Sequence, residues 1–131
     1  MNNLSIEATK YTPRIHFQAD KHHLIIEGES YPENTIAFYQ EVFDWLETYL
    51  ETYAEEPLTV RIKISYFNSS SSKALFDLFD MLDQSAEQGK KISVSWLYAE
   101  GDDIAQEYGE DFQMDLESLD FELIEFADGE A

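Results

Sequence analysis

The sequence predicts one α/β domain over residues 1–131, with a mixed β-sheet of five or six strands and helices mainly on one face. Short segments that alternate apolar and polar residues fill the first third of the chain, and helix-like and strand-like segments alternate in the rest. The clearest strand pattern, Leu58 to Tyr66, has a polar face, whereas a parallel strand covered by helices on both sides would be apolar throughout.

Three strands are expected before the first helix. The segments Leu4–Ala8, Arg14–Gln18 and His23–Gly28 alternate as half-buried strands do, and turn residues such as Pro13 separate them. This spacing indicates an antiparallel meander.

The first helix is expected to begin near Ser30. Ser30 followed by Glu33 fits a capping box, and Pro32 fits the first turn, where amide donors lack partners. Apolar residues then recur at steps of three and four until about Ala54, and Pro57 blocks any continuation. The predicted apolar stripe consists of Ile36, Tyr39, Phe43, Leu46, Leu50 and Tyr53.

The strand Leu58–Tyr66 is followed by a serine run and a second amphipathic helix. Gly89 is placed as the stop of this helix, with Lys90 and Lys91 near the negative end of its dipole. A strand at Ile92–Tyr98 then implies a parallel pair joined by a right-handed crossover. The apolar stripe of the second helix consists of Leu75, Phe76, Phe79, Leu82 and Ala86.

The end of the chain predicts two more elements. A short acidic helix is expected at about Asp103–Phe112 and a last strand at Phe121–Phe126. The final residues, Ala127 to Ala131, are expected to fray.

The charge balance limits the classes of partner. The chain has 8 basic and 28 acidic residues, a net charge of −20, and no Lys or Arg follows Lys91. Such a field repels nucleic acids and anionic lipid surfaces, so we expect no nucleic-acid binding. No run of about 18 apolar residues occurs, and the segment from Met1 to Thr9 does not read as a signal peptide. We therefore expect a cytoplasmic protein without membrane insertion.

Several kinds of chemistry lack support in the sequence. Without cysteine, zinc would depend on His16, His22 and His23, and the last two point to opposite faces of a strand. A calcium loop starting at Asp111 would need Gly where Leu116 stands. The sequence has no G-x-S-x-G turn, which would indicate a serine nucleophile, and no Gly-rich loop, which would indicate a phosphate site. The sequence therefore indicates no metal, no cofactor and no enzyme.

The serine run, Asn68 followed by Ser69 to Ser72 and Lys73, has two interpretations. Asn and Ser favour N-cap positions because their side chains accept hydrogen bonds from amides of the first helical turn. The same amides and the helix dipole also suit an anion, so a phosphoryl group on a hydroxyl here would be tolerated locally. It would add about −1.5 to −2 charges and make the loop a binary switch for a binding partner.

Two motifs carry a resemblance to a known family. They are Gly28-Glu29-Ser30-Tyr31-Pro32-Glu33-Asn34 and Tyr66-Phe67-Asn68-Ser69-Ser70-Ser71-Ser72-Lys73, and each precedes a helix. Over essentially its whole length the chain resembles the SiaC-type bacterial regulatory phosphoproteins. The resemblance implies a fold related to anti-sigma-factor antagonists (STAS domains), with the regulated hydroxyl at the start of the helix after a central strand.

The resemblance also implies a partner-switching circuit. In such a circuit a GHKL-type serine/threonine kinase phosphorylates the protein and a PP2C-type phosphatase restores it. The bare form then binds and activates a diguanylate cyclase, which raises cyclic di-GMP and favours aggregation or biofilm growth. By position, the phosphoacceptor is Ser69, and the loop that meets partner or kinase comprises Asn68, Ser70, Ser71 and Lys73, with Lys73 steadying the phosphoryl group.

Two alternatives stay open at the level of sequence. The same scaffold fits an antagonist of an anti-sigma factor, which would govern transcription instead of second-messenger synthesis. An enzyme with a serine nucleophile would need a base and a concave pocket beside Ser69. The sequence does not decide whether Ser70, Ser71 or Ser72 is modified as well.

Overall fold

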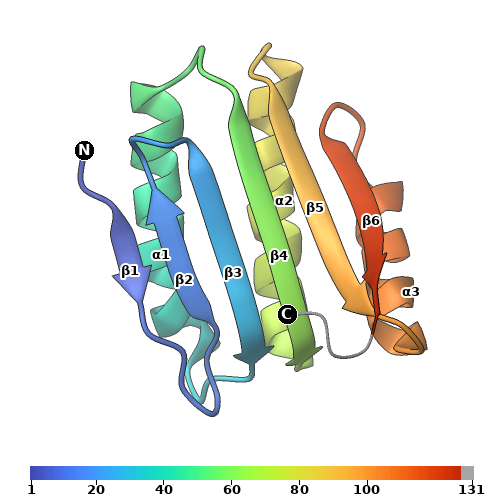
Figure 1. Ribbon diagram of the computed structural model, residues 1–131. Helices are drawn as coiled ribbons and strands as arrows, with labels where there is room; N and C mark the ends of the chain where they lie inside the picture. Colours follow the sequence, from blue (N-terminus) through green and yellow to red (C-terminus); the bar gives the residue numbers. More distant parts are fainter. Residues whose placement is uncertain (128–131) are drawn as a thin grey trace.

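The strands of the protein pair in the order in which they occur along the chain. The computed structural model describes residues 1–127, and within them six strands form one sheet with three helices on it (Figure 1). The strands are β1 (Leu4–Ile6), β2 (Arg14–Gln18), β3 (His23–Ser30), β4 (Leu58–Phe67), β5 (Ile92–Ala99) and β6 (Asp120–Phe126). The helices are α1 (Thr35–Thr52), α2 (Ser69–Glu87) and α3 (Asp103–Met114).

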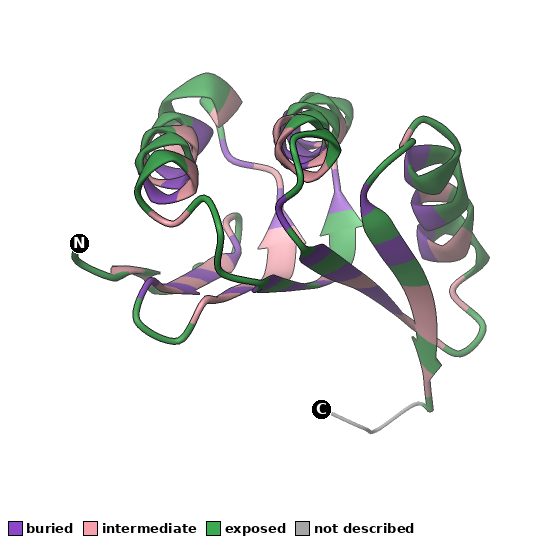
Figure 2. Ribbon diagram, turned by 90° about the horizontal axis from the view of Figure 1, so that it is seen from above, coloured by how far each residue is buried: buried purple, intermediate pink, exposed green. Residues whose placement is uncertain are grey.

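The sheet is mixed. Strands β1, β2 and β3 pair antiparallel, whereas β3 to β6 pair parallel, with one helix in each connection. Because right-handed crossovers that proceed in one direction across a sheet stay on one side of it, all three helices lie on the same face (Figure 2). The predicted mixed sheet with helices on one face is confirmed.

Strand β4 shows why the other face stays uncovered. Its alternate residues Leu58, Val60, Ile62 and Ile64 are buried beneath the helices. Thr59, Arg61 and Ser65 lie between them and are exposed on the opposite side. The period of two in the sequence therefore assigns one apolar face to the core and one polar face to water.

An aromatic cluster anchors α2 and α3 to the sheet. The Trp96 ring of β5 lies 5.4 Å from that of Phe112 in α3, and Phe79 of α2 lies 5.1 Å from the same Phe112 ring. The indole Nε1 of Trp96 donates to the carbonyl of Ala105 at 3.0 Å, so the buried ring has a polar partner.

The start of α1 differs from the prediction. The helix begins at Thr35, and its N-cap is Asn34, whose side chain accepts from the Ala37 amide. The predicted capping box at Ser30 is wrong, because Ser30 is the last residue of β3. Its side chain is buried on the same face of the strand as Leu24 and Ile26. The predicted stripe is correct at Tyr39 and Leu46, but Ile36 is 80% exposed. Val42 and Tyr49 are fully buried in α1, whereas the predicted Phe43, Leu50 and Tyr53 are only half-buried.

Helix α2 also departs in detail. Phe76 is 42% exposed instead of buried, because the core-facing stripe passes through Ala74, Leu75 and Leu78. The helix ends at Glu87, and Gly89 follows with a φ of 109°, as expected of a glycine stop.

The side chain of Lys90 does not lie at the negative end of the α2 dipole, as was predicted. It is buried, and its Nζ donates to the Tyr53 and Glu56 carbonyls beyond the carboxyl end of α1. Burial lowers the pKa of Lys90, while the charge of Glu56 acts in the opposite direction.

The two ends of the chain complete the description. The fraying was expected for Ala127 to Ala131; of these, residues 128–131 lie outside the described residues, and Ala127 is exposed and follows the end of β6. Among residues 1–127, no helix combines the length and apolar character that a membrane span requires.

Candidate functional site at the start of helix α2

The amino ends of the three helices meet at one edge of the sheet. Each helix follows a parallel strand, so its first turn lies at the carboxyl end of that strand (Figure 1). The three N-caps are Asn34, Asn68 and Asp102, and each side chain accepts a hydrogen bond from an amide three residues later. The serine run belongs to the central helix of the three.

Asn68 fixes the start of α2. It is the single residue between β4 and the helix, and its side chain accepts from the Ser71 amide at 2.9 Å. Its carbonyl accepts from the Ser72 amide, and its own amide donates to the Ser30 carbonyl at 3.2 Å. The N-cap interpretation of Asn68 is confirmed, and the amides of Ser69 and Ser70 remain at the open end of the helix.

The four serines point in different directions because each helical residue turns the side chain by about 100°. Ser69 and Ser70 are exposed, Ser72 is half-buried, and Ser71 has no exposed surface. Ser69 is the first residue of the helix, which is where the predicted phosphoacceptor was expected.

Ser71 belongs to a buried hydroxyl network. The Ser30 hydroxyl donates to that of Ser71 at 2.9 Å and lies 2.6 Å from the hydroxyl of Tyr39. Burial raises the pKa of Tyr39, and the two serine hydroxyls act against that shift. The placement of Ser71 on the partner-binding surface is therefore corrected: its side chain faces the core and joins β3, α1 and α2.

Sequence reasoning missed Ser30 and Tyr39 as partners of the serine run. The available signal was the strand period, because Ser30 has the same parity as the core-facing Leu24 and Ile26. A buried serine at a strand end requires a hydrogen-bond partner, and the serine run is a source of hydroxyls.

Ser69 and Ser70 face different neighbours. Ser69 lines a shallow hollow of about 320 Å³ between α2 and α3, together with Tyr108, Asp111 and Asp115. Ser70 lines a hollow of about 560 Å³ between α1 and α2.

Lys73 reaches both of these hollows. Its side chain is 78% exposed, and its ammonium lies 3.3 Å from the Asp77 carboxylate. Lys73 is therefore the basic residue of α2 that lies nearest in sequence to Ser69 and Ser70.

The Ser69 hydroxyl lacks the partner that a serine nucleophile would need. Within residues 1–127, no hydrogen bond joins it to a histidine or a carboxylate, and the acids of the hollow are Asp111 of α3 and Asp115 directly after α3. His22, one of the three histidines considered as ligands, instead lies with its Nδ1 2.7 Å from the Tyr49 hydroxyl. In the described part of the chain, no three His, Asp or Glu side chains gather around a common point.

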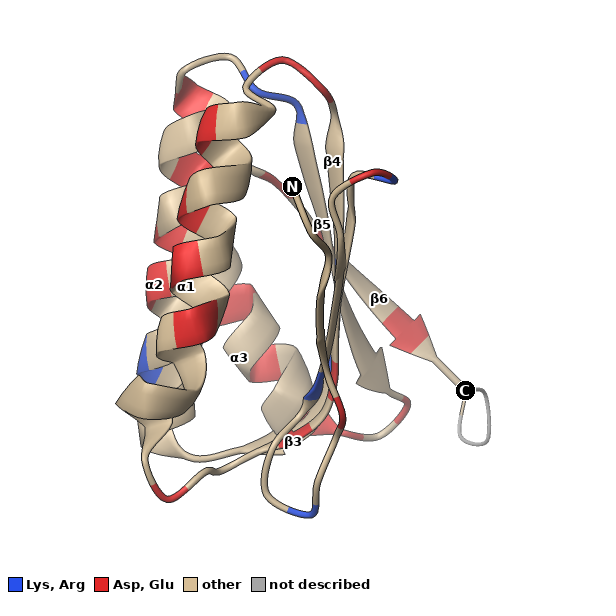
Figure 3. Cartoon of the chain, turned by 90° about the vertical axis from the view of Figure 1, so that its left-hand side faces the viewer, with Lys and Arg blue, Asp and Glu red and all other residues tan. Residues whose placement is uncertain are grey.

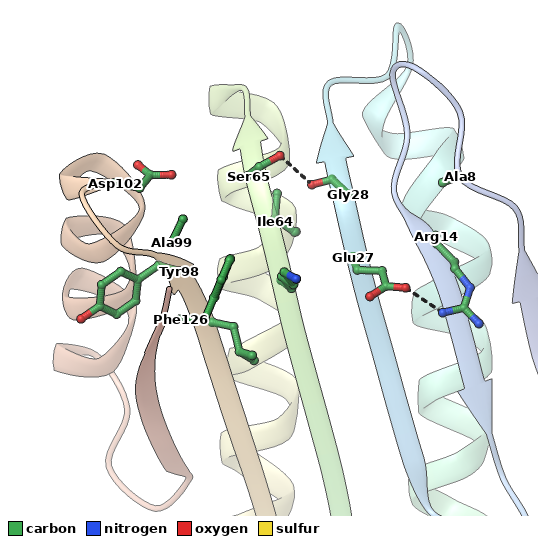
Figure 4. Close-up of a pocket in the computed structure, with 12 residues that line it drawn as sticks. Ala8, Arg14, Glu27, Gly28, Ile64, Ser65, Tyr98, Ala99, Asp102 and Phe126 are labelled. Carbon is green, nitrogen blue, oxygen red and sulfur yellow. Dashed lines mark hydrogen bonds and ion pairs between the residues drawn. The ribbon is translucent and has the colours of Figure 1, made fainter. Parts of the chain in front are cut away.

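Another hollow lies on the uncovered face of the sheet (Figure 4). Two of its charged side chains, Arg14 and Glu27, form an ion pair at 2.7 Å, and the Lys63 ammonium lies 4.4 Å from the centre of the Phe126 ring. It contains none of the site residues expected from the sequence.

The fold and this site define a class: a small α/β protein that presents exposed hydroxyls on a capped helix after a central strand. The chain matches the SiaC family regulatory phosphoproteins over residues 6–126, and it belongs to that family. An uncharacterized protein of Pseudomonas aeruginosa (strain UCBPP-PA14) is 33% identical over 115 residues, which cover 88% of this chain and 90% of that protein.

Solved structures agree with this assignment. SiaC of Pseudomonas aeruginosa has a TM-score of 0.88 at 31% identity, over 96% of this chain and 100% of that one. A chain in the crystal structure of the diguanylate cyclase SiaD in complex with its activator SiaC, also from P. aeruginosa, has a TM-score of 0.89 at 32% identity, over 94% and 99% of the two chains.

Proposed function

We propose that this protein is a non-enzymatic regulator, switched by phosphorylation of Ser69, whose bare form binds and activates a diguanylate cyclase. The observation that carries the proposal is the position of Ser69, exposed as the first residue of α2 beside the amides of the first turn. Membership of the SiaC family supports the switch, and the solved complex of SiaD with its activator SiaC supports the choice of effector.

The switch works by a change of charge. A phosphoryl group on Ser69 adds about −1.5 to −2 charges at neutral pH. The helix dipole, the free amides and Lys73 stabilise this group locally. An effector that buries the bare hydroxyl would have to desolvate a dianion after phosphorylation, and this cost releases it.

Two enzymes complete the proposed circuit. A GHKL-type kinase transfers phosphate from ATP to Ser69, and a PP2C-type phosphatase removes it. Asn68 and Ser70 shape the surface that the kinase and the effector meet, and Lys73 steadies the phosphoryl group. The circuit is cytoplasmic, because the kinase draws on cytoplasmic ATP.

The first test locates the modified hydroxyl. The protein is incubated with its kinase and ATP and then digested for mass spectrometry. We expect one phosphate on Ser69, none on the Ser69→Ala variant and normal modification of Ser70→Ala, which is the matched control because Ser70 is also exposed. Phosphate on Ser70 in the wild-type protein would overturn the assignment of the site.

The second test measures binding to the diguanylate cyclase. Ser69→Ala should bind like the bare wild-type protein and keep binding after kinase treatment, whereas Ser69→Asp should lose binding and fail to stimulate cyclic di-GMP synthesis. Equal affinity of the two variants would contradict the switch.

A further inference from the structure

Local sequence does not decide where α2 starts. Asn and Ser are similarly good N-cap residues, and Asn68 is followed by four serines. If the helix started one residue later, the Ser69 hydroxyl would become the cap and would accept from the Ser72 amide. The second turn offers no such choice, because Ala74 and Leu75 are held in the core. A contact from outside the serine run therefore selects the arrangement of the first turn.

Ser30 provides that contact, and it bonds to α2 at two points. Its backbone carbonyl accepts from the Asn68 amide at 3.2 Å, and its hydroxyl donates to that of Ser71 at 2.9 Å. Within the first turn, the Asn68 side chain accepts from the Ser71 amide at 2.9 Å. Together these bonds form a closed ring, so the end of β3 fixes both the position and the rotation of the first turn of α2.

Ser69 and Ser70 lie between the two residues that this ring holds. Because Asn68 and Ser71 are both fixed, the side chains between them project in set directions, that of Ser69 toward α3 and that of Ser70 toward α1. The ring closes only while the Ser71 hydroxyl points into the core. The rotation that buries Ser71 is therefore the one that exposes Ser69.

Tyr39 connects the ring to α1. Its hydroxyl lies 2.6 Å from that of Ser30. The Ser30 hydroxyl has one proton, which it gives to Ser71, so Tyr39 is the donor in its own bond with Ser30. All three side chains are buried, and a buried hydroxyl that loses its partner is destabilising. Loss of one hydroxyl therefore weakens the whole chain of bonds.

We propose that Ser30, Tyr39 and Ser71 are positioning residues, which hold the first turn of α2 in one arrangement and thereby restrict phosphorylation to Ser69. This inference rests on the proposed function and adds the reason why one serine of the run is chosen. Because all three side chains are buried, they act through the backbone that carries Ser69 and not by contact with the kinase.

The first experiment removes one hydroxyl of the network. Tyr39→Phe deletes the hydroxyl and keeps the buried ring. Tyr49→Phe is the matched control, because Tyr49 is buried in the same helix and its hydroxyl lies 2.7 Å from Nδ1 of His22. Both variants are incubated with the kinase and ATP, and the modified serines are located by mass spectrometry.

In Tyr39→Phe, we expect phosphorylation of Ser69 to slow by about two- to tenfold, the effect of one hydrogen bond. Phosphate should also appear on Ser70 or Ser72, whereas Tyr49→Phe should be modified on Ser69 alone and at the wild-type rate. A general loss of stability would not move phosphate from one serine to another.

The second experiment tests whether the hydroxyls act as a unit. Ser71→Ala removes the acceptor of the Ser30 hydroxyl and should redistribute phosphate as Tyr39→Phe does. Adding Tyr39→Phe to Ser71→Ala should then change the distribution by less than about twofold, because residues in one network are not additive. Ser72→Ala, in the same turn but outside the network, should leave phosphate on Ser69 alone.

A third measurement reads the first turn without a kinase. Hydrogen exchange of the Asn68 and Ser71 amides, which both donate within the ring, should be faster in Tyr39→Phe than in the wild-type protein or in Tyr49→Phe. Equal exchange in all three proteins would overturn the role of the network in holding the turn.

The outcomes separate this inference from the proposed function. If Tyr39→Phe and Ser71→Ala carry phosphate on Ser69 alone at the wild-type rate, the positioning role is wrong and the switch at Ser69 stands. If the wild-type protein is modified on Ser70 instead, the choice of Ser69 is wrong. The positioning role then stands only if Tyr39→Phe moves the phosphate and Tyr49→Phe does not. A wild-type protein that takes up no phosphate overturns both.

Discussion

Asp83 of α2 holds the connection between α3 and β6 in place. Its carboxylate accepts hydrogen bonds from the backbone amides of Leu119, Ser118 and Glu117 at 2.8, 2.9 and 3.3 Å. Partial burial alone would raise the pKa of Asp83, but the three amides outweigh it, and the pKa is lowered. This side chain therefore stabilises the fold in its charged form.

The Asp83→Asn variant should lose about 1–3 kcal/mol of unfolding free energy at neutral pH, because one amide replaces a charged acceptor of several bonds. A lowered folded-state pKa means that the contribution of Asp83 is present above the unfolded pKa and lost as pH falls through the folded one. Urea unfolding of the wild-type protein and of Asp83→Asn should thus show a difference in unfolding free energy at pH 7, and this difference should become smaller in acid.

Asp80→Asn is the control for this prediction, since Asp80 is exposed on the same helix and accepts a hydrogen bond from the Gln84 side chain, not from backbone amides of another element within residues 1–127. We expect it to unfold like the wild-type protein at both pH values. A difference for Asp83→Asn that stays constant with pH would show that its charge plays no part.

Residue-scale details of the site were only partly predictable. Asn68 as N-cap followed from residue type, and the exposure of Ser69 followed from its place at the helix start. The burial of Ser71 did not, because it depends on the rotation of α2 against Ser30 and Tyr39, which are distant in sequence. Local patterns carry no information on such long-range contacts.

At the scale of elements, α3 sits unusually close to the sheet. A Cβ added at Gly109 would lie 2.5 Å from Cδ1 and 2.7 Å from Nε1 of the Trp96 ring. Glycine is therefore required here by close packing against β5, not by backbone conformation.

Gly109→Ala should destabilise the protein by about 1–3 kcal/mol, because the methyl group forces α3 away from the buried Trp96 ring. Helix propensity alone predicts the opposite sign, a gain of about 1 kcal/mol for alanine over glycine. Thermal or urea unfolding decides between them, with the exposed Glu107→Ala of the same helix as a near-neutral control.

The first turn of α2 depends on its cap. Asn68→Ala removes the acceptor of the Ser71 amide and should lower stability by about 1 kcal/mol. It should also loosen the turn that presents Ser69, which hydrogen exchange of the Ser71 and Ser72 amides would report. Asp102→Ala, the equivalent change at α3, should cost similar stability without faster exchange at those amides.

Elements were more predictable than their ends. Strand β4 and the helices followed from apolar periods of two and of three to four, because one face of each must be buried. The predicted start of α1 was wrong. Ser30 and Glu33 match a capping pattern in the sequence, but β3 continues through Ser30. Ile36 and Phe76 were assigned to the core from spacing alone, and spacing does not reveal where a helix surface extends past the sheet.

At the scale of the whole molecule, the helical layer carries a strong negative charge. Neither α1 nor α3 contains a Lys or Arg, and the net charge of the chain is −20 (Figure 3). Like charges held close together on one layer repel each other, which opposes folding.

Sodium chloride should therefore stabilise the protein. The screening length falls from about 30 Å at 0.01 M to about 3 Å at 1 M salt, so repulsion within the helical layer weakens. We expect the melting temperature to rise with sodium chloride, measured by circular dichroism at pH 7. Chloride is preferable to sulfate, which also stabilises proteins by exclusion from their surface.

The double variant Glu107→Lys/Glu110→Lys tests the same idea from the opposite side. It reduces the negative charge of α3 at two exposed positions and should melt at a higher temperature in dilute buffer, with a smaller salt effect. A melting temperature that is independent of salt in both proteins would contradict a role for self-repulsion.

The rotation of α2 also gives the serine run a selectivity of its own. The four serines are identical in sequence but differ in exposure because of the helical turn. Ser71 is buried in the core, Ser72 is half-buried, and Ser69 and Ser70 are exposed on opposite sides of α2. Under the proposed switch, a kinase would therefore meet only two exposed hydroxyls in the serine run, on different sides of the helix. If the proposal holds, none of the neighbouring serines would replace Ser69, because none of them occupies the same position in space.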